Sequence, residues 1–192
     1  TGTGKSNLVV DLIGQDVVAG RGCGLLDAKG DTADDVLAAL AAMPEENWPA
    51  LARDLVVIDP ADPNCRAFFN PLEVRLRGSA SRQCQDMVSV VKKVFGVDDT
   101  QAPRLGLVLR RSLQLAMDHG LTLCDVPRIL TDGEFRVSLV QHSEDEALRR
   151  FWELEFPDSP SAQAAWTASS LVRLETLLDD PAIRRFLGQP RS

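Results

Sequence analysis

The sequence predicts an α/β fold in which a partial parallel sheet is followed by a mostly helical region. Near its start the chain alternates helical segments with two short apolar runs, Cys23–Asp27 and Leu55–Ile58. Beyond residue 79 such runs disappear and apolar residues recur at helical spacing. We therefore divide the chain into residues 1–73, the sheet-containing core, and residues 74–192, an all-helical appended or inserted region. The core strands are expected to resume after residue 192.

The chain opens with a glycine-rich turn that leads into an amphipathic helix. Glycines at 20 and 22 end this helix, whose apolar face comprises Leu8, Val9, Leu12, Ile13 and Val17. The run Cys23–Asp27 that follows is predicted to be a buried parallel strand. A second helix is expected over residues 33–42, with Asp31 or Thr32 as its cap.

The run Leu55–Ile58 is rich in β-branched residues and is predicted to be a second buried strand. A proline-rich loop follows and extends to Pro71. Asp59, Asp62 and Asn70 lie in this loop, where turn formation is favoured over a functional role.

The later part of the chain carries the signals of several helices. Ser143 and Glu146 form a capping box before an aromatic-rich segment, and Asp180 with Pro181 begins another short helix. The large aromatic residues are expected in the core; these are Trp48, Phe151, Trp152, Phe156 and Trp166. The basic pairs Lys92-Lys93 and Arg110-Arg111 fit solvated helix faces better than contacts with nucleic acid.

Composition excludes several classes of protein. A net charge of -7 and a pI near 4.9 argue against a protein that coats nucleic acid with a basic surface. The four cysteines lack the spacing of a zinc site or a disulfide framework, which favours reduced thiols and a cytoplasmic location. No apolar run approaches the roughly 18 residues of a membrane helix. A position at the cytoplasmic face of the inner membrane would therefore require segments outside this sequence.

The most informative motif lies at the start of the chain. Residues 1–7 read T-G-T-G-K-S-N, the second half of the phosphate-binding pattern G-x-x-x-x-G-K-[ST]. The first glycine of that pattern would precede Thr1 by two residues, so the chain is expected to be part of a longer domain. Small residues let backbone N–H groups approach phosphate oxygens closely, and the following helix directs its positive end toward them.

This motif predicts a site for ATP and Mg²⁺. Lys5 supplies a mobile positive charge for the β and γ oxygens, and the Ser6 hydroxyl is the predicted magnesium ligand. Asp27 lies at the carboxyl end of the first predicted strand, where such sheets bind ligands, and is taken with Lys5 as catalytic. For Lys29 and Asp31 nearby, a nucleotide contact and a purely structural role are equally favoured. The predicted nucleotide-binding residues are Thr1, Gly2, Thr3, Gly4, Lys5, Ser6 and Asn7.

The chain resembles the HerA/FtsK-like P-loop ATPases, in the branch of type IV secretion and conjugation ATPases with TraG-like and TraD-like coupling proteins. The resemblance covers nearly the whole chain. Its carriers include T-G-T-G-K-S-N at 1–7, L-L-D-A-K-G-D at 25–31, V-V-I-D-P-A-D at 56–62, F-N-P-L at 69–72 and F-W-E-L-E-F at 151–156. It implies a RecA-like core, a homo-hexameric ring, ATP hydrolysis between subunits, and movement of DNA or a protein–DNA complex.

The resemblance also implies parts that the chain does not contain. The Walker B aspartate and the catalytic glutamate are expected beyond Ser192, so this chain is expected to bind ATP weakly and not to hydrolyse it. The alternative function is a nucleotide-dependent interaction module whose helical region docks relaxosome or secretion proteins. A P-loop phosphotransferase is a weaker alternative, because no acceptor pocket or arginine-bearing lid can be assigned.

Overall fold

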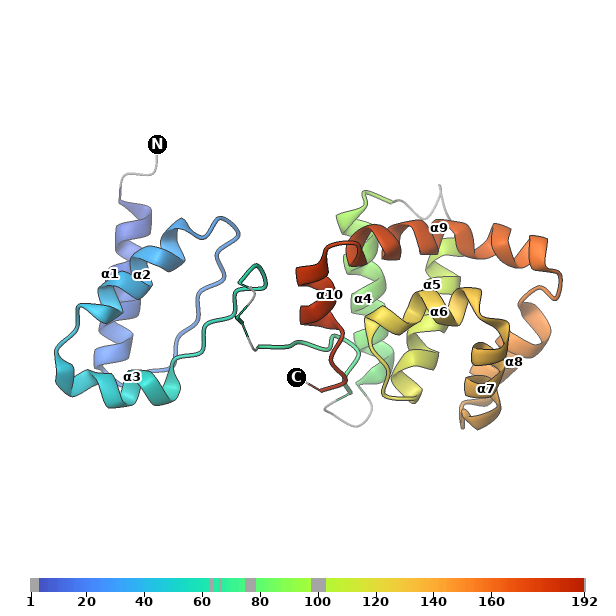
Figure 1. The fold of residues 1–192 in the computed structure, drawn as a ribbon, viewed down its shortest axis with the longest axis horizontal. Coiled ribbons are helices and arrows are strands. Elements are labelled where there is room, and N and C mark those ends of the chain that lie inside the picture. The colour runs from blue at the N-terminus through green and yellow to red at the C-terminus, as the bar shows by residue number, and fades with distance from the viewer. Residues whose placement is uncertain (1–3, 63, 66, 75–78, 98–102, 192) are drawn as a thin grey trace. The chain divides into compact units, whose positions relative to one another are not determined.

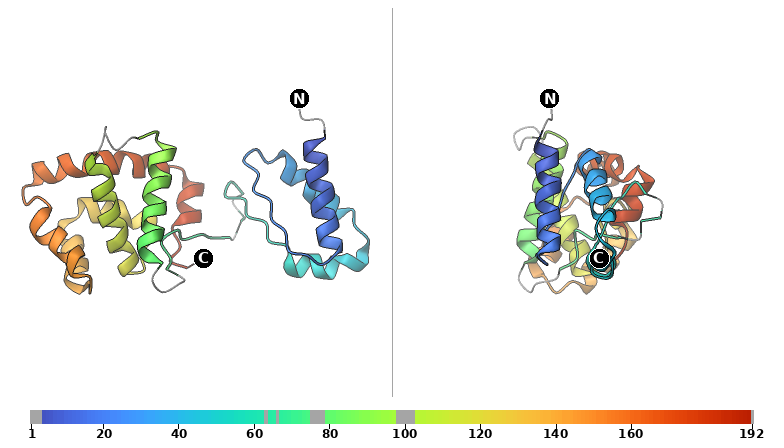
Figure 2. Two further views of the ribbon diagram at one scale, coloured as in Figure 1. Left: turned by 180° about the vertical axis from the view of Figure 1, so that it is seen from behind. Right: turned by 90° about the vertical axis from the view of Figure 1, so that its left-hand side faces the viewer.

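The computed structural model describes residues 4–62, 64–65, 67–74, 79–97 and 103–191. The chain divides into two compact units, residues 1–57 and residues 58–192. The boundary falls earlier than residue 73 because the loop after Ile58 packs within the second unit. Each unit is described by itself (Figures 1 and 2).

The first unit contains two long helices and a shorter one. Helix α1 spans Lys5–Val18 and α2 spans Asp31–Ala41, and the two lie side by side (Figures 1 and 2). A 3₁₀ turn, Glu45–Asn47, leads into α3, Trp48–Asp54, which has proline in its first turn. Both long helices were predicted from the sequence, the first from its apolar spacing and the glycines that end it, and both are confirmed.

The predicted α/β fold is wrong for this structure. In the described residues every regular element is helical, and both Cys23–Asp27 and Leu55–Ile58 lack strand structure. A strand requires a ladder of hydrogen bonds to a neighbour, and the described chain supplies no such neighbour to either run. A short β-branched run shows a preference for extended backbone, but it does not show that a pairing partner exists.

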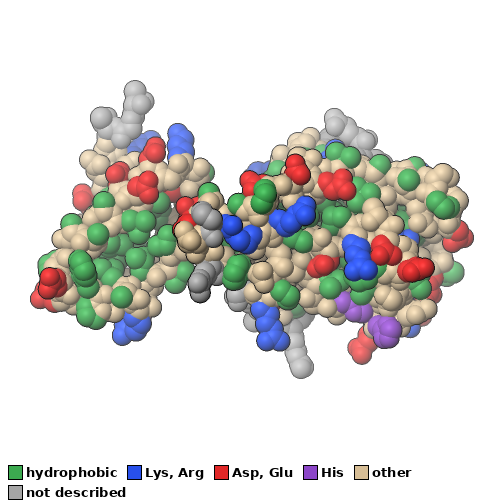
Figure 3. Space-filling view, in the orientation of Figure 1, with side chains coloured by type: hydrophobic (Ala, Val, Ile, Leu, Met, Phe, Trp, Pro, Cys, Tyr) green, Lys and Arg blue, Asp and Glu red, His purple; other side chains and the backbone are tan. Residues whose placement is uncertain are grey.

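The first unit therefore has a small core and a large exposed apolar surface. Among its described residues only Val36 and Leu40, one turn apart on α2, are buried. Leu26 is 100% exposed and Val56 is 74% exposed, although both were expected inside a sheet. Figure 3 shows hydrophobic side chains gathered on this unit. Trp48, predicted to be in the core, is 51% exposed.

The second unit is a bundle of helices. Its helices are α4 (Ala80–Val94), α5 (Pro103–Asp118), α6 (Val126–Thr131), α7 (Gly133–His142), α8 (Glu146–Arg150), α9 (Pro160–Leu178) and α10 (Pro181–Leu187). A 3₁₀ turn, Leu123–Asp125, precedes α6, and a π-helical turn, Phe151–Glu155, follows α8. The helical character predicted for residues 74–192 is confirmed in the described part of that region.

Helix α5 lies at the centre of this bundle. Leu105, Val108, Leu109 and Leu113 recur at the three- and four-residue intervals of one helical face, and each is at most 1% exposed. This helix packs against α4, α6 and α9. The core of the second unit is thus built from the buried apolar face of α5 and the apolar faces of the helices around it.

An aromatic cluster closes one side of the core. Phe151, Trp152 and Phe156 are buried as predicted, and Trp166 of α9 is half-buried beside them. Edge contacts join Trp152 to Phe156, with ring centroids 4.8 Å apart, and Phe156 to Trp166, with centroids 6.1 Å apart. The π-helical turn carries Phe151 and Trp152 into the core together.

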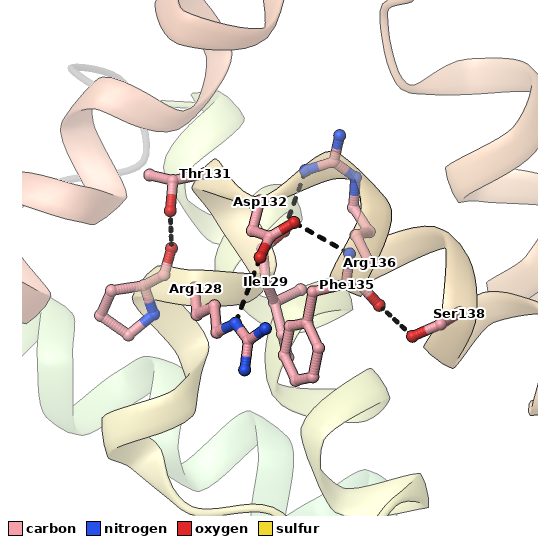
Figure 4. A network of polar contacts seen from close by, with 8 residues as sticks. Arg128, Ile129, Thr131, Asp132, Phe135, Arg136 and Ser138 are labelled. Atoms are coloured by element: carbon pink, nitrogen blue, oxygen red, sulfur yellow. Dashed lines mark hydrogen bonds and ion pairs between the residues drawn. The ribbon is translucent and has the colours of Figure 1, made fainter.

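Arg136 of α7 lies buried next to this cluster. Its guanidinium donates to the carbonyl oxygen of Ile129 at 2.9 Å and to the side chain of Gln163 at 3.1 Å. It also lies over the ring of Phe156, 4.8 Å from the centroid. Figure 4 shows the turn between α6 and α7, where the Asp132 carboxylate accepts from the backbone N–H of Phe135 and from Arg128. The hydrogen bonds that Arg136 donates satisfy carbonyl groups at the end of α6.

The proline-rich loop belongs to the second unit. Asp59 and Asp62 accept hydrogen bonds from backbone N–H groups two residues ahead, at 2.9 and 2.8 Å, which is the turn chemistry expected of them. Asn70 is 3% exposed and donates to the carbonyl oxygens of Leu121 and Pro190. The loop is thus fastened to the second unit at Asn70.

Two helix starts in the second unit test the predicted caps, and one of them differs from the prediction. Asp145, and not Ser143, caps α8, because its carboxylate accepts from the N–H groups of Ala147 and Leu148. The Ser143 hydroxyl instead donates to Asp118. At α10 the prediction is confirmed, since Asp180 accepts from the N–H of Ala182 and proline opens the helix. No helix in the described residues is long and apolar enough to cross a membrane.

Candidate phosphate-binding site

The glycine-rich motif leads directly into α1. Thr1, Gly2 and Thr3 lie outside the described residues, so the structure bears on the motif from Gly4 onward. Gly4 is the residue before the first turn of the helix, which begins at Lys5. The side chains of Lys5 and Asn7 are exposed, and that of Ser6 is half-buried.

Gly4 has a backbone conformation that favours glycine. Its φ is +109°, a region that residues with a Cβ rarely adopt. A Cβ at this position would meet nothing within 4 Å, so the backbone angle and not the available space requires glycine. The chain turns here into α1, and none of the described residues lies against this side of the turn.

The first turn of α1 carries the leading N–H groups of the helix. No described side chain caps it, and it carries no acidic residue. The leading N–H groups of a helix have no partner within the helix, and the helix dipole adds positive potential at this end. An anion placed here would accept hydrogen bonds from these groups.

Lys5 and Ser6 add the side chains that a magnesium-bound polyphosphate requires. An exposed ammonium reaches phosphate oxygens as a mobile charge, and a hydroxyl oxygen is a ligand that Mg²⁺ accepts. In the described part of the chain no group of three or more His, Cys, Asp or Glu could hold a metal. The Ser6 hydroxyl could supply one oxygen ligand to a magnesium ion bound to phosphates.

Asp27 organises the segment that leads into α2. One carboxylate oxygen accepts from the N–H of Lys29 at 3.0 Å, and the other accepts from those of Thr32 and Ala33 at 2.9 and 3.1 Å. The hydrogen bond from Lys29, together with those from Ala33 and Thr32, lowers the pKa of Asp27. A carboxylate held in this way is a weak base. Its predicted catalytic role stays a prediction beside this structural one.

The start of α2 differs from the expected arrangement. Asp31 or Thr32 was expected to cap the helix, but Asp27 accepts from its leading N–H groups. Asp31 is the first residue of α2, where its negative charge suits the helix dipole. The side chain of Lys29 is exposed, and only its backbone contacts Asp27.

One contact at this site was missed in the sequence. The hydroxyl of Thr32 lies 3.5 Å from the hydroxyl of Ser6, so the first turns of α2 and α1 meet. The residues are 26 positions apart, and no spacing rule relates them. The available signal was a hydroxyl residue directly after the L-L-D-A-K-G-D segment, in the first turn of a predicted helix.

The remaining candidate residues lie in the second unit, where Asp59, Asp62, Asn70 and Arg111 make structural contacts. Asp59, Asp62 and Asn70 hold the proline-rich loop, as described above. Arg111 is half-buried, and its guanidinium lies 5.4 Å from the ring centroid of Phe151, while Arg110 is exposed. The pair Arg110-Arg111 is therefore split between the core and the surface.

Comparison of the chain with protein-family models, with curated proteins and with solved structures gives no match.

Proposed function

We propose that this chain is the ATP-binding part of an ATP-driven motor that moves DNA or a protein–DNA complex, as in conjugation or type IV secretion. The observation that carries the proposal is the G-K-S sequence placed at the start of α1, with Gly4 at φ +109° and an exposed Lys5. The nucleotide is ATP, held by the first turn of α1 and by Lys5, with Mg²⁺ on Ser6.

The two parts of this proposal have different support. Nucleotide binding is supported by backbone conformation and by the exposed donors of α1. The motor function is supported by the resemblance of the motifs at 1–7, 25–31 and 69–72 to HerA/FtsK-like ATPases. The partners that follow from it are DNA, further copies of the chain in a homo-hexameric ring, and secretion or relaxosome proteins.

Binding without turnover is the expected behaviour of this chain. Hydrolysis needs a group that orients the attacking water, and the hydrogen bonds to Asp27 lower its pKa and make it a poor base. Bound Mg²⁺ would polarise the terminal phosphate. The residues of the chain hold and orient the triphosphate, with Lys5 at the β and γ oxygens.

The test is equilibrium binding of a fluorescent ATP analogue with Mg²⁺. Lys5→Ala should weaken binding at least tenfold, because it removes a charge that contacts the phosphates directly. The control is Arg53→Ala, which removes one positive charge from an exposed pair with Asp54 in the same unit. Equal affinities of Lys5→Ala and the wild type would refute the proposal. Phosphate release that depends on Lys5 would refute the expectation of binding without turnover.

A further inference from the structure

The hydroxyl of Thr32 lies beside the hydroxyl of Ser6. The two side-chain oxygens lie 3.5 Å apart, and both residues are half-buried. The Thr32 hydroxyl donates to the Ser6 oxygen at this separation, which is long for a hydroxyl pair, and rotation of each O–H about its bond to carbon can reverse the direction of donation without moving either oxygen. The contact joins the first turns of two helices that pack side by side.

Asp27 fixes the position of Thr32. Its carboxylate accepts from the N–H of Thr32 at 2.9 Å and from that of Ala33 at 3.1 Å. The same carboxylate accepts from the N–H of Lys29, which folds the intervening loop. The backbone at Thr32 is therefore held independently of the Thr32 hydroxyl, which remains available to a neighbour.

A serine that ligates magnesium needs a partner of this kind. Its oxygen offers a lone pair to the metal, and its single proton must then be donated elsewhere. The Thr32 oxygen has two lone pairs and can accept that proton. A hydrogen bond donated to such an outer partner orients a metal ligand and strengthens its binding.

We propose that Thr32 is a positioning residue for the predicted magnesium ligand, Ser6, an inference that rests on the proposed function. The Thr32 oxygen accepts the Ser6 hydroxyl proton and keeps the lone pair of Ser6 directed at the metal. Thr32 itself contacts neither the metal nor the nucleotide. Its effect is therefore confined to binding that requires Mg²⁺.

The experiment compares affinities for the fluorescent ATP analogue in Mg²⁺ and in EDTA. Thr32→Val keeps the shape of the side chain but removes the hydroxyl, and should lower affinity about tenfold in Mg²⁺. Affinity in EDTA should not change. Thr32→Ser retains the hydroxyl and should bind as the wild type does in both conditions. Equal losses for Thr32→Val in Mg²⁺ and in EDTA would indicate a role in folding only and would overturn the inference.

A double-mutant cycle with Ser6→Ala tests whether Thr32 acts through Ser6. In the Ser6→Ala background, Thr32→Val should cause no further loss in Mg²⁺. A further tenfold loss there would overturn the inference. The outcomes separate it from the proposed function: Lys5-dependent binding with an unaffected Thr32→Val variant refutes only the inference. Absence of Lys5-dependent binding refutes both.

Discussion

At the scale of single residues, Arg136 shows how a buried cation can stabilise a helical core. It is 6% exposed, and burial lowers the pKa of its guanidinium. Its partners are the carbonyl oxygen of Ile129, the amide of Gln163 and the aromatic rings beside it, so hydrogen bonds and ring contacts offset the loss of hydration. Lysine cannot reproduce this arrangement, since it lacks a planar fork of donors.

Replacement of Arg136 should therefore destabilise the second unit. We expect Arg136→Met to lower the free energy of unfolding by about 2–4 kcal/mol, because carbonyl oxygens at the end of α6 lose their donor. Arg136→Lys should recover only part of this loss. Urea unfolding followed by tryptophan fluorescence measures both. The control, Arg150→Met, breaks an exposed pair with Glu155 at 3.8 Å and should change stability by less than about 1 kcal/mol.

At the scale of elements, the start of α2 depends on the charge of Asp27. Hydrogen bonds from backbone N–H groups, that of Lys29 first, lower its pKa below the ordinary value of 3.8. A carboxyl whose pKa is lower in the folded state stabilises that state above pH 3.8, and the stabilisation is lost as pH falls through the folded pKa. Helix α2 should therefore loosen at its start in acid.

This pH dependence can be followed at the amides that Asp27 accepts from. The NMR signals of the Thr32 and Ala33 amides should titrate together, with a midpoint below pH 3.8. Asp27→Asn should abolish the titration, because the side chain then carries no charge. Asp31→Asn is the matched control. It removes a nearby carboxylate charge, while Asp27 remains the acceptor for these two amides. A midpoint above pH 3.8 in the wild type would contradict the prediction.

Helices could be predicted from the sequence more completely than the pairing of strands. Helix α5 can be predicted because its own apolar spacing defines the buried face. Helix α10 can be predicted because Asp180 and Pro181 supply the cap locally. The run Leu55–Ile58 carries the composition of a strand, yet strand formation depends on a neighbour that local sequence does not specify. Apolar spacing and local caps were therefore informative about helices, whereas β-branched composition was misleading about the sheet.

The candidate site shows the same division. Gly4, Lys5 and Ser6 could be proposed as a site because the pattern typical of phosphate binding, a glycine turn and a helix start, lies in consecutive residues. The contact between Ser6 and Thr32 depends on how two helices pack, and the sequence alone does not give that geometry. The cap of α2 was misassigned because the Asp27 carboxylate reaches across the loop to amides five and six residues ahead.

At the scale of the whole molecule, the two units differ in how completely they bury their apolar residues. The second unit buries one face of α5 and joins distant parts of its chain, whereas the first leaves Leu26 and Val56 exposed. Asn70 makes two of these long-range connections. Its amide nitrogen donates to the carbonyl of Leu121 at 3.3 Å and to that of Pro190 at 3.0 Å, and its oxygen accepts from the N–H of Leu72.

Breaking this connection should release the end of the second unit. Asn70→Asp removes the amide donors and places a carboxylate oxygen against two carbonyl oxygens, so the segment after α10 should detach. Hydrogen exchange at Phe69, whose N–H donates to the carbonyl of Phe186 at 2.9 Å, should accelerate, while exchange in α5 should not change. Asn64→Asp makes the same substitution at an exposed position of the same loop and should leave both rates as in the wild type. If exchange accelerated equally in α5, Asn70 would support the whole core; if it accelerated nowhere, the amide of Asn70 would not be what holds the chain end.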